Sequence, residues 1–145
     1  MSPVQLVRVG SDSMTPALHS GDLVVVEPLA DPPRHGDVVT IRHPDDGDRL
    51  IKRIVAVGGE EVAVEDGVLV VDGRRVCERL VDPERQDGVW FGPITVPTGA
   101  VFLLGDDRGS SIDSREFGAV DETDIGGRVR LRIWPSPGPL PAADC

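Results

Sequence analysis

The sequence predicts a mostly β fold made of short strands joined by turns. Apolar residues make up 39% of the 145 residues, enough for a packed core, whereas aromatic residues make up only 3%. Most apolar side chains are therefore valine, leucine and isoleucine, a composition that suits pleated sheets. The 17 glycines and 13 prolines add turn positions and interrupt helices. These counts favour many short strands over a helical bundle, and the length suits one domain.

The expected strands are apolar or alternating runs separated by turn residues. They lie at residues 4–9, 23–26, 37–42, 50–57, 61–64, 68–71, 74–76, 94–96, 100–104 and 126–134. The last run alternates apolar and polar residues, which is typical of a half-buried strand. Residues 65–67 and 72–73 have the composition of hairpin turns. We expect a loop at residues 77–92, one helical turn at 121–125, and a mobile Pro-rich tail at 136–145.

The chain is acidic, with 15 basic and 25 acidic residues and a formal net charge of −10. Such a surface repels phosphate backbones, so we expect no nucleic-acid partner. It also repels anionic membrane surfaces unless its basic residues are clustered. The simplest interpretation of the charge is that it keeps the chain in solution.

Neither the cysteines nor the apolar runs indicate a metal site or a membrane span. Cys77 and Cys145 lack the spacing of zinc ligands, so we expect no metal and no cofactor. A disulfide between them stays open, but we interpret both as incidental because Cys145 ends a tail expected to be loose. No apolar run approaches the ~20 residues that span a bilayer. The first ten residues do not resemble a signal peptide, and we expect a soluble chain as given.

Three polar segments beside apolar strands are candidates for a functional site: residues 11–18, 50–54 and 105–115. Lys52 lies in an apolar strand next to Arg53, and strand neighbours point to opposite faces. If Lys52 faces inward, burial lowers its pKa and makes it a base; otherwise it is an edge lysine that reaches water. Ser13 lies between a strand end and Pro16, where a hydroxyl can be held rigidly, although most serines in such segments are plain turn residues.

A serine nucleophile with a lysine base is a known variant of the catalytic triad. The three segments resemble the sequence boxes of type I signal peptidases, the bacterial Ser-Lys proteases of the S26 type. Ser11-Asp12-Ser13-Met14-Thr15-Pro16 matches Ser-x-Ser-Met-x-Pro, Gly21-Asp22 matches the next box, and Ile51-Lys52-Arg53-Ile54 matches the lysine box. Residues 105–115 match Gly-Asp-Asn-Arg-x-x-Ser-x-Asp-Ser-Arg. The resemblance runs in order from about residue 7 to 134.

The resemblance implies a role for each matching residue. Ser13 would be the nucleophile and Lys52 its general base. Ser111 would orient Lys52, and the Ser11 hydroxyl and Ser13 amide would stabilise the oxyanion. Residues with a structural role near the site would be Gly105, Asp106, Arg108, Asp113 and Arg115, the last two as a salt bridge.

The resemblance also implies a fold of the signal-peptidase type, a β-barrel or coiled antiparallel sheets with a small hairpin insertion. A single peptidase domain would cover residues 1–135, with its catalytic core at about 4–58 and 98–134 and the insertion at about 59–97. A preprotein or peptide would bind as an extended strand and be cut after an Ala-x-Ala-like segment. Its side chains would contact Val9, Met14, Leu18, Leu50 and Ile51.

The chain departs from the family pattern in three places. Members usually begin with membrane-spanning helices and sit at the plasma membrane with the active site on the outer face. No such helix is present here, so membrane association rests on the resemblance alone. The lysine box usually continues Gly-x-Pro-Gly-Asp, whereas residues 56–60 read Ala-Val-Gly-Gly-Glu, and Asp107 replaces an asparagine.

Other functions are compatible with the same motifs. The leading hypothesis is a serine endopeptidase that removes leader segments, and the first alternative is a maturation protease devoted to one partner protein. A non-catalytic peptide-binding relative is a second alternative. Self-cleaving repressors share the Ser-Lys arrangement, but only twelve residues precede Ser13, which disfavours self-processing.

Overall fold

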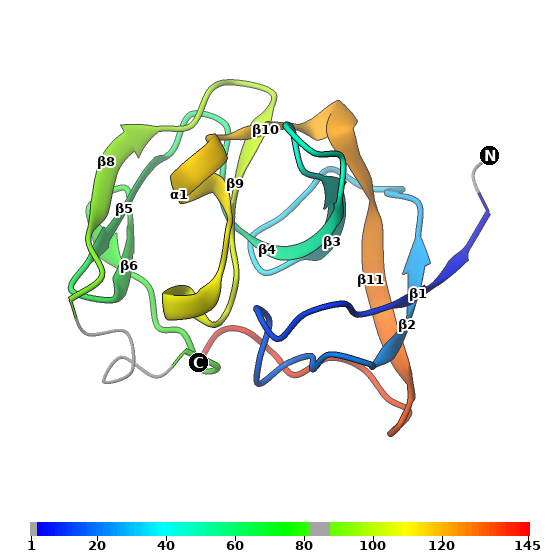
Figure 1. Ribbon diagram of the computed structural model, residues 1–145. Coiled ribbons are helices and arrows are strands. Elements are labelled where there is room, and N and C mark those ends of the chain that lie inside the picture. The colour runs from blue at the N-terminus through cyan, green and yellow to red at the C-terminus, as the bar shows by residue number, and fades with distance from the viewer. Residues whose placement is uncertain (1–2, 82–87) are drawn as a thin grey trace.

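The computed structural model describes residues 3–81 and 88–145, and its strands form two antiparallel sheets (Figure 1). The larger sheet has the order β1 (Gln5–Arg8), β2 (Leu23–Glu27), β11 (Ile125–Trp134), β3 (Val38–Arg42), β4 (Arg49–Val57), β9 (Ala100–Leu104) and β10 (Val120–Asp121). The smaller sheet has the order β7 (Arg74–Arg75), β6 (Val68–Val71), β5 (Glu61–Glu65) and β8 (Phe91–Thr95). The mostly β class is confirmed. Over the described residues the larger sheet runs from β1 to β10 without closing, so the structure has open sheets and not a barrel.

Strand β4 is the element around which the larger sheet is organised. It pairs with β3 on one side and β9 on the other. Six consecutive residues of β4, from Ile51 to Ala56, are buried, and so is every residue of β9. Because both faces of these strands are covered, their apolar runs are continuous and do not alternate. The two charged residues of β4, Lys52 and Arg53, are therefore both buried, although they point to opposite faces.

The hydrophobic core joins the two sheets. Phe102 and Leu104 of β9 share one buried cluster with Val62 and Val64 of β5. In Figure 1 the smaller sheet lies at the left, beside β9 and α1. Each such side chain stabilises the fold by roughly 1.5–3 kcal/mol when fully buried. The segment expected as an insertion is thus packed against the rest of the chain through this core.

Short elements account for the differences from the predicted secondary structure. The helical turn expected at residues 121–125 is confirmed as the 3-10 turn Glu122–Asp124. Helix α1 (Ser114–Phe117) and strand β10 were not predicted, because elements of four and two residues carry no periodicity. The loop expected at 77–92 gives way to β8 at Phe91, since Pro93 is tolerated in an edge strand; residues 82–87 lie outside the described part. Among the described residues, no helix is both long and apolar enough to cross a membrane.

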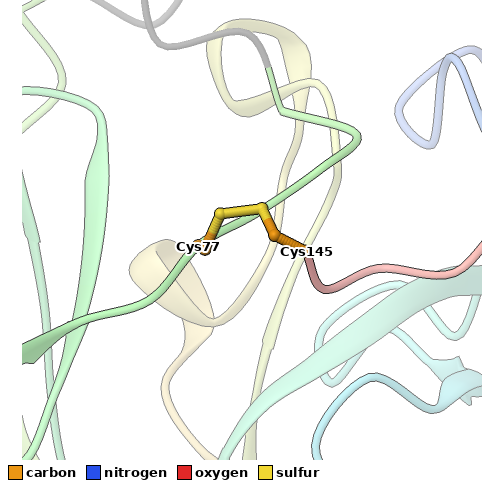
Figure 2. The surroundings of a disulfide bond; sticks show 2 residues. All are labelled: Cys77 and Cys145. Atoms are coloured by element: carbon orange, nitrogen blue, oxygen red, sulfur yellow. A yellow bond between two sulfur atoms is a disulfide. The ribbon is translucent and has the colours of Figure 1, made fainter.

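The C-terminal segment is attached to the rest of the chain by a disulfide and by noncovalent contacts. It runs back from the end of β11 along the lower side of Figure 1, and a disulfide joins Cys145 to Cys77 (Figure 2). Arg132 and Gly138 form a β-bridge, and Leu140 packs against the core cluster of β1 and β2. From the sequence we interpreted the two cysteines as incidental. This interpretation was wrong, because they form a disulfide. Sequence alone allowed this single pairing but could not decide whether the bond forms, because the two cysteines lie 68 positions apart and neither is in a recognisable motif.

Candidate active site

The three polar segments of the sequence meet at one place. Ser13 lies in the connection between β1 and β2, Lys52 lies in β4, and Ser111 lies in the connection between β9 and α1. The Nζ atom of Lys52 is 2.9 Å from the Oγ atom of Ser13 and 3.0 Å from the Oγ atom of Ser111. The amine of Lys52 thus contacts two serines, one 39 positions before it in the sequence and one 59 positions after it.

A compact turn holds Ser13 against the core. Met14 is 1% exposed and Leu18 is 0% exposed, so both anchor the turn in the core cluster of β1, β2 and β11. The Leu18 amide donates to the carbonyl oxygen of Met14 at 3.0 Å. The carboxylate of Asp12 accepts a hydrogen bond from the Ser20 amide at 2.8 Å, which closes the turn. Ser13 itself is 8% exposed, at the border between core and surface.

Burial sets the protonation of Lys52. The residue is only 3% exposed, and this desolvation lowers the pKa of its ammonium below the ordinary value of a lysine. The negative charge of Asp113 opposes this effect, but burial outweighs it. Lys52 is also the only lysine in the 145-residue sequence, whose other basic residues besides histidine are all arginines. A lysine differs from an arginine in that it can lose its proton in a protein.

A short chain of hydrogen bonds extends from Lys52 to Arg115. The Ser111 hydroxyl donates to Oδ2 of Asp113 at 2.9 Å. Two guanidinium nitrogens of Arg115 donate to the same carboxylate at 2.9 Å each, so the expected salt bridge is present. Burial by itself raises the pKa of Asp113, but the hydrogen bonds and charge of Arg115 outweigh it and leave this pKa below its usual value. Asp113 therefore stays ionised and keeps the Ser111 hydroxyl directed.

Gly105 allows two of the segments to approach closely. A Cβ atom at this position would collide with Oγ of Ser111 and lie 2.8 Å from the backbone oxygen of Ser13. The amide of Asp107 donates to that same backbone oxygen at 2.9 Å. The absence of a side chain at residue 105 is thus what lets the loop of Ser111 contact the turn of Ser13.

Two ion pairs, one buried and one partly buried, fasten this loop to the rest of the chain. Arg53 donates two hydrogen bonds to the carboxylate of Asp106, both at 2.9 Å. Arg108 donates to the backbone oxygen of Gly105 at 2.7 Å and to both carboxylate oxygens of Glu78 at 2.9 and 2.5 Å. Glu78 was not among the residues predicted from the sequence. It lies in a segment interpreted as loop, and no local signal relates it to a residue 30 positions away.

The two expected oxyanion donors lie side by side. The Ser11 hydroxyl is 3.2 Å from Oγ of Ser13, and the Ser13 amide donates to the Ser11 hydroxyl at 3.4 Å. Both donors therefore border the hydroxyl that would attack a substrate. The contact of the Ser13 amide is at the long end of the hydrogen-bond range, so it holds the Ser11 hydroxyl only weakly.

A groove of about 350 Å³ opens beside Ser13 and Lys52. Of the residues expected to contact a substrate, Val9, Met14, Leu50 and Ile51 line it. Leu18 does not, because its side chain is entirely in the core. Three charged residues that were not predicted to contact a substrate also line the groove: Arg8, Asp48 and Arg49.

The arrangement is suited to moving a proton between a hydroxyl and an amine. A general base must lie within about 2.6–3.2 Å of the group that it deprotonates. The amine of Lys52 meets this requirement for Ser13, and its lowered pKa favours the neutral form, which can accept a proton. The groove places space for a ligand beside the same hydroxyl.

Comparison with known proteins assigns the chain to a family. The family model described as signal peptidase, peptidase S26, matches residues 1–134. The chain is 36% identical over 142 residues to signal peptidase I of Bacillus caldolyticus, covering 88% of this chain and 78% of that protein. It is 33% identical over 140 residues to signal peptidase I of Leptolyngbya laminosa, covering 88% of this chain and 67% of that protein.

The fold agrees with this assignment. A crystal structure of a signal peptidase I from Enterococcus faecalis superposes with a TM-score of 0.58 at 30% identity, covering 68% of this chain and 97% of that one. The chain therefore belongs to the S26 family of signal peptidases. It is a serine peptidase, a hydrolase.

Proposed function

We propose that the chain is an endopeptidase that cuts leader segments from preproteins with a Ser13–Lys52 dyad. The observation that carries this proposal is the contact of 2.9 Å between Lys52 Nζ and Ser13 Oγ, both buried. Membership of the signal peptidase family supports the preprotein substrate.

The reaction begins when the neutral amine of Lys52 takes the proton of the Ser13 hydroxyl. The Ser13 oxygen attacks the scissile carbonyl carbon and forms a tetrahedral oxyanion. When the C–N bond breaks, Lys52 returns the proton to the leaving amine, and an acyl-Ser13 ester remains. Water then attacks the ester, with Lys52 again taking and returning one proton, and releases the carboxylic acid. Each half of the cycle restores the starting protonation of Lys52.

Two further serines would assist these steps. The Ser13 amide and the Ser11 hydroxyl would donate to the oxyanion, where one donor typically contributes about 3–4 kcal/mol. Ser111 would keep the Lys52 amine aligned, since its hydroxyl contacts Nζ at 3.0 Å and is itself held by Asp113. Arg115 would act indirectly, because its ion pair holds Asp113 in place.

The substrate would bind as an extended strand in the groove beside Ser13. Val9 and Leu50 line that groove from two separate segments of the larger sheet region, so a peptide between them could pair with backbone groups. The apolar parts of the groove would take small side chains before the cut, as in an Ala-x-Ala segment. Association with a membrane surface remains part of this proposal.

The alternative is a maturation protease devoted to one partner protein. The charged residues Arg8, Asp48 and Arg49 in the groove favour it, because they could select for charges in a particular partner. A non-catalytic peptide-binding role would use the same groove without the proton transfer.

Cleavage of a peptide that carries an Ala-x-Ala segment tests the proposal. We expect the parent protein to cut it, and Ser13→Ala and Lys52→Ala to lower kcat by at least about 1000-fold while remaining folded. Ser110→Ala is the matched control, because this exposed serine neighbours Ser111 in sequence and should leave kcat unchanged. Full activity in Ser13→Ala would overturn the mechanism. A folded parent that cuts only one natural partner would support the dedicated protease instead.

A further inference from the structure

The loop that carries Ser111 depends on a residue from the second sheet region. Glu78 follows β7 by three positions, outside the motifs that identify the family. Its carboxylate receives two hydrogen bonds from Arg108, whose side chain is 0% exposed. Among the described residues, Glu78 is the only charged partner of this guanidinium.

Arg108 links Glu78 to both ends of the loop. Its Nε atom donates to the backbone oxygen of Gly105 at 2.7 Å, next to the contact between Gly105 and Ser111. Its own backbone oxygen accepts a hydrogen bond from Arg115 at 2.9 Å. Arg115 in turn holds Asp113, which holds the Ser111 hydroxyl. Movement of Arg108 would therefore reach Ser111 from two directions.

The C-terminal segment fixes Glu78 in place. Glu78 forms a β-bridge with Asp144, and the amide of Arg79 donates to the backbone oxygen of Ala143 at 2.9 Å. The disulfide between Cys77 and Cys145 closes this short pairing at the residue before Glu78 (Figure 2). Without that covalent bond, two backbone contacts at the end of the chain would hold little, because terminal pairings fray readily.

We propose that Glu78 is a positioning residue for the active site: through Arg108 it holds the loop of Ser111 against Lys52, and the Cys77–Cys145 disulfide holds Glu78. The inference rests on the proposed function for its kinetic readout. It adds that Glu78, a residue outside the three catalytic segments, helps to position the loop of Ser111. It also makes activity sensitive to the redox state of one exposed cysteine pair.

The direct test compares Glu78→Gln and Glu78→Asp with the parent. Glu78→Gln keeps the shape of the side chain but removes its charge, and we expect kcat to fall by about 10- to 100-fold, as for a small displacement of a catalytic group. Glu78→Asp keeps the charge and should retain more of the activity. Asp37→Asn is the matched control, because the Asp37 carboxylate is about as exposed as that of Glu78 and its ion pair with Arg128 does not contact the loop.

A second readout does not need turnover. Lys52 is the only lysine in this sequence, so protein labelled with ¹³C-lysine gives one side-chain signal whose shift follows the protonation of its amine. The charged groups that act on Lys52 are Asp113, Arg115, Asp106 and Glu116, and burial is the largest influence. If Glu78→Gln lets water reach Lys52, its pKa rises toward the ordinary value. A loss of stability alone would not move this titration in the folded protein.

Reduction tests the disulfide. The sequence has two cysteines, so a reductant can act on the fold only through this bond. Below the unfolding temperature, we expect reduction to lower kcat and raise the Lys52 pKa, as in Glu78→Gln. The double variant Cys77→Ser/Cys145→Ser should show both changes and no response to reductant.

The outcomes separate this inference from the proposed function. If Glu78→Gln matches Asp37→Asn in both kcat and the Lys52 titration, Glu78 is not a positioning residue. If reduction is complete and neither readout changes, the disulfide does not hold Glu78. A parent whose activity survives Ser13→Ala contradicts the proposed function instead, and the Lys52 titration then decides the inference by itself.

Discussion

At the scale of single residues, one buried amine lies at the centre of the proposed active site. Lys52 lies in the central strand β4, is 3% exposed, and contacts two hydroxyls from distant loops. Fourteen of the 15 lysine and arginine residues are arginines, which stay charged at any ordinary pH. The one residue of this class that can become neutral is therefore the one placed beside Ser13.

The pH dependence of cleavage should report this residue. Because only neutral Lys52 can accept the Ser13 proton, we expect kcat/KM to rise with pH through the pKa of Lys52 and then level off. Since burial lowers this pKa, the plateau should begin below the ordinary lysine value of about 10.4. An acid limb that coincides with an ordinary lysine would contradict the assignment of the base.

The same shift sets the sign of a stability change. Between the lowered pKa in the folded protein and about 10.4, the unfolded chain binds more protons at Lys52 than the folded chain does. The free energy of unfolding should therefore rise with pH across this window. Denaturant titrations of the parent and Lys52→Met isolate the effect, because the variant lacks this contribution.

At the scale of elements, the site depends on how β4 is joined to the loop after β9. Arg53 follows Lys52 in β4, and its ion pair with Asp106 is 5% and 1% exposed on the two sides. A further hydrogen bond of 2.8 Å runs from Arg53 to the backbone oxygen of Gly36. Strand alternation thus places the proposed base on one face of β4 and its structural support on the other.

Breaking this pair should be costly. Arg53→Met leaves the carboxylate of Asp106 buried without its partner, so we expect the free energy of unfolding to fall by about 3–5 kcal/mol. Urea denaturation followed by circular dichroism measures the change. Glu27→Gln is the control, since it removes an ion pair with Arg130 that is 3.8 Å long and largely exposed. That variant should lose no more than about 1 kcal/mol; equal losses in both would show that burial of the pair is unimportant.

At the scale of the whole molecule, the two sheets are held together by a shared core and by one covalent bond. Phe102 and Leu104 of the larger sheet pack against Val62 and Val64 of the smaller one. The disulfide ties the C-terminal segment to the residues that follow β7. The proposed site lies on the larger sheet, and Arg108 of its loop forms an ion pair with Glu78, which follows strand β7 of the smaller sheet.

Reduction of the disulfide should lower global stability as well as activity. The bond closes a loop with a sequence separation of 68, for which the chain-entropy model gives about 4 kcal/mol. Chemical denaturation with and without reductant measures this loss. The midpoint of Cys77→Ser/Cys145→Ser should not respond to reductant, and an unchanged midpoint in the fully reduced parent would mean that the bond does not constrain the unfolded chain.

The sequence by itself predicted most strands, because apolar runs such as residues 100–104 are short, rich in β-forming residues and bounded by turn residues. It also identified Ser13, Lys52 and Ser111 as candidates, because their motifs are local and occur in order. It missed β10 and α1, which are too short to show a period. It placed Leu18 in the groove, although its apolar side chain anchors the turn in the core.

Only the tertiary structure decided which groups meet. Whether Lys52 faces inward depends on the strands β3 and β9 beside it, and its contacts come from residues 39 and 59 positions away. The pairing of Cys77 with Cys145 and of Glu78 with Arg108 likewise joins distant segments. A local sequence pattern indicates which helix or strand a segment forms. The distance between two side chains from distant segments is set by how those elements pack together.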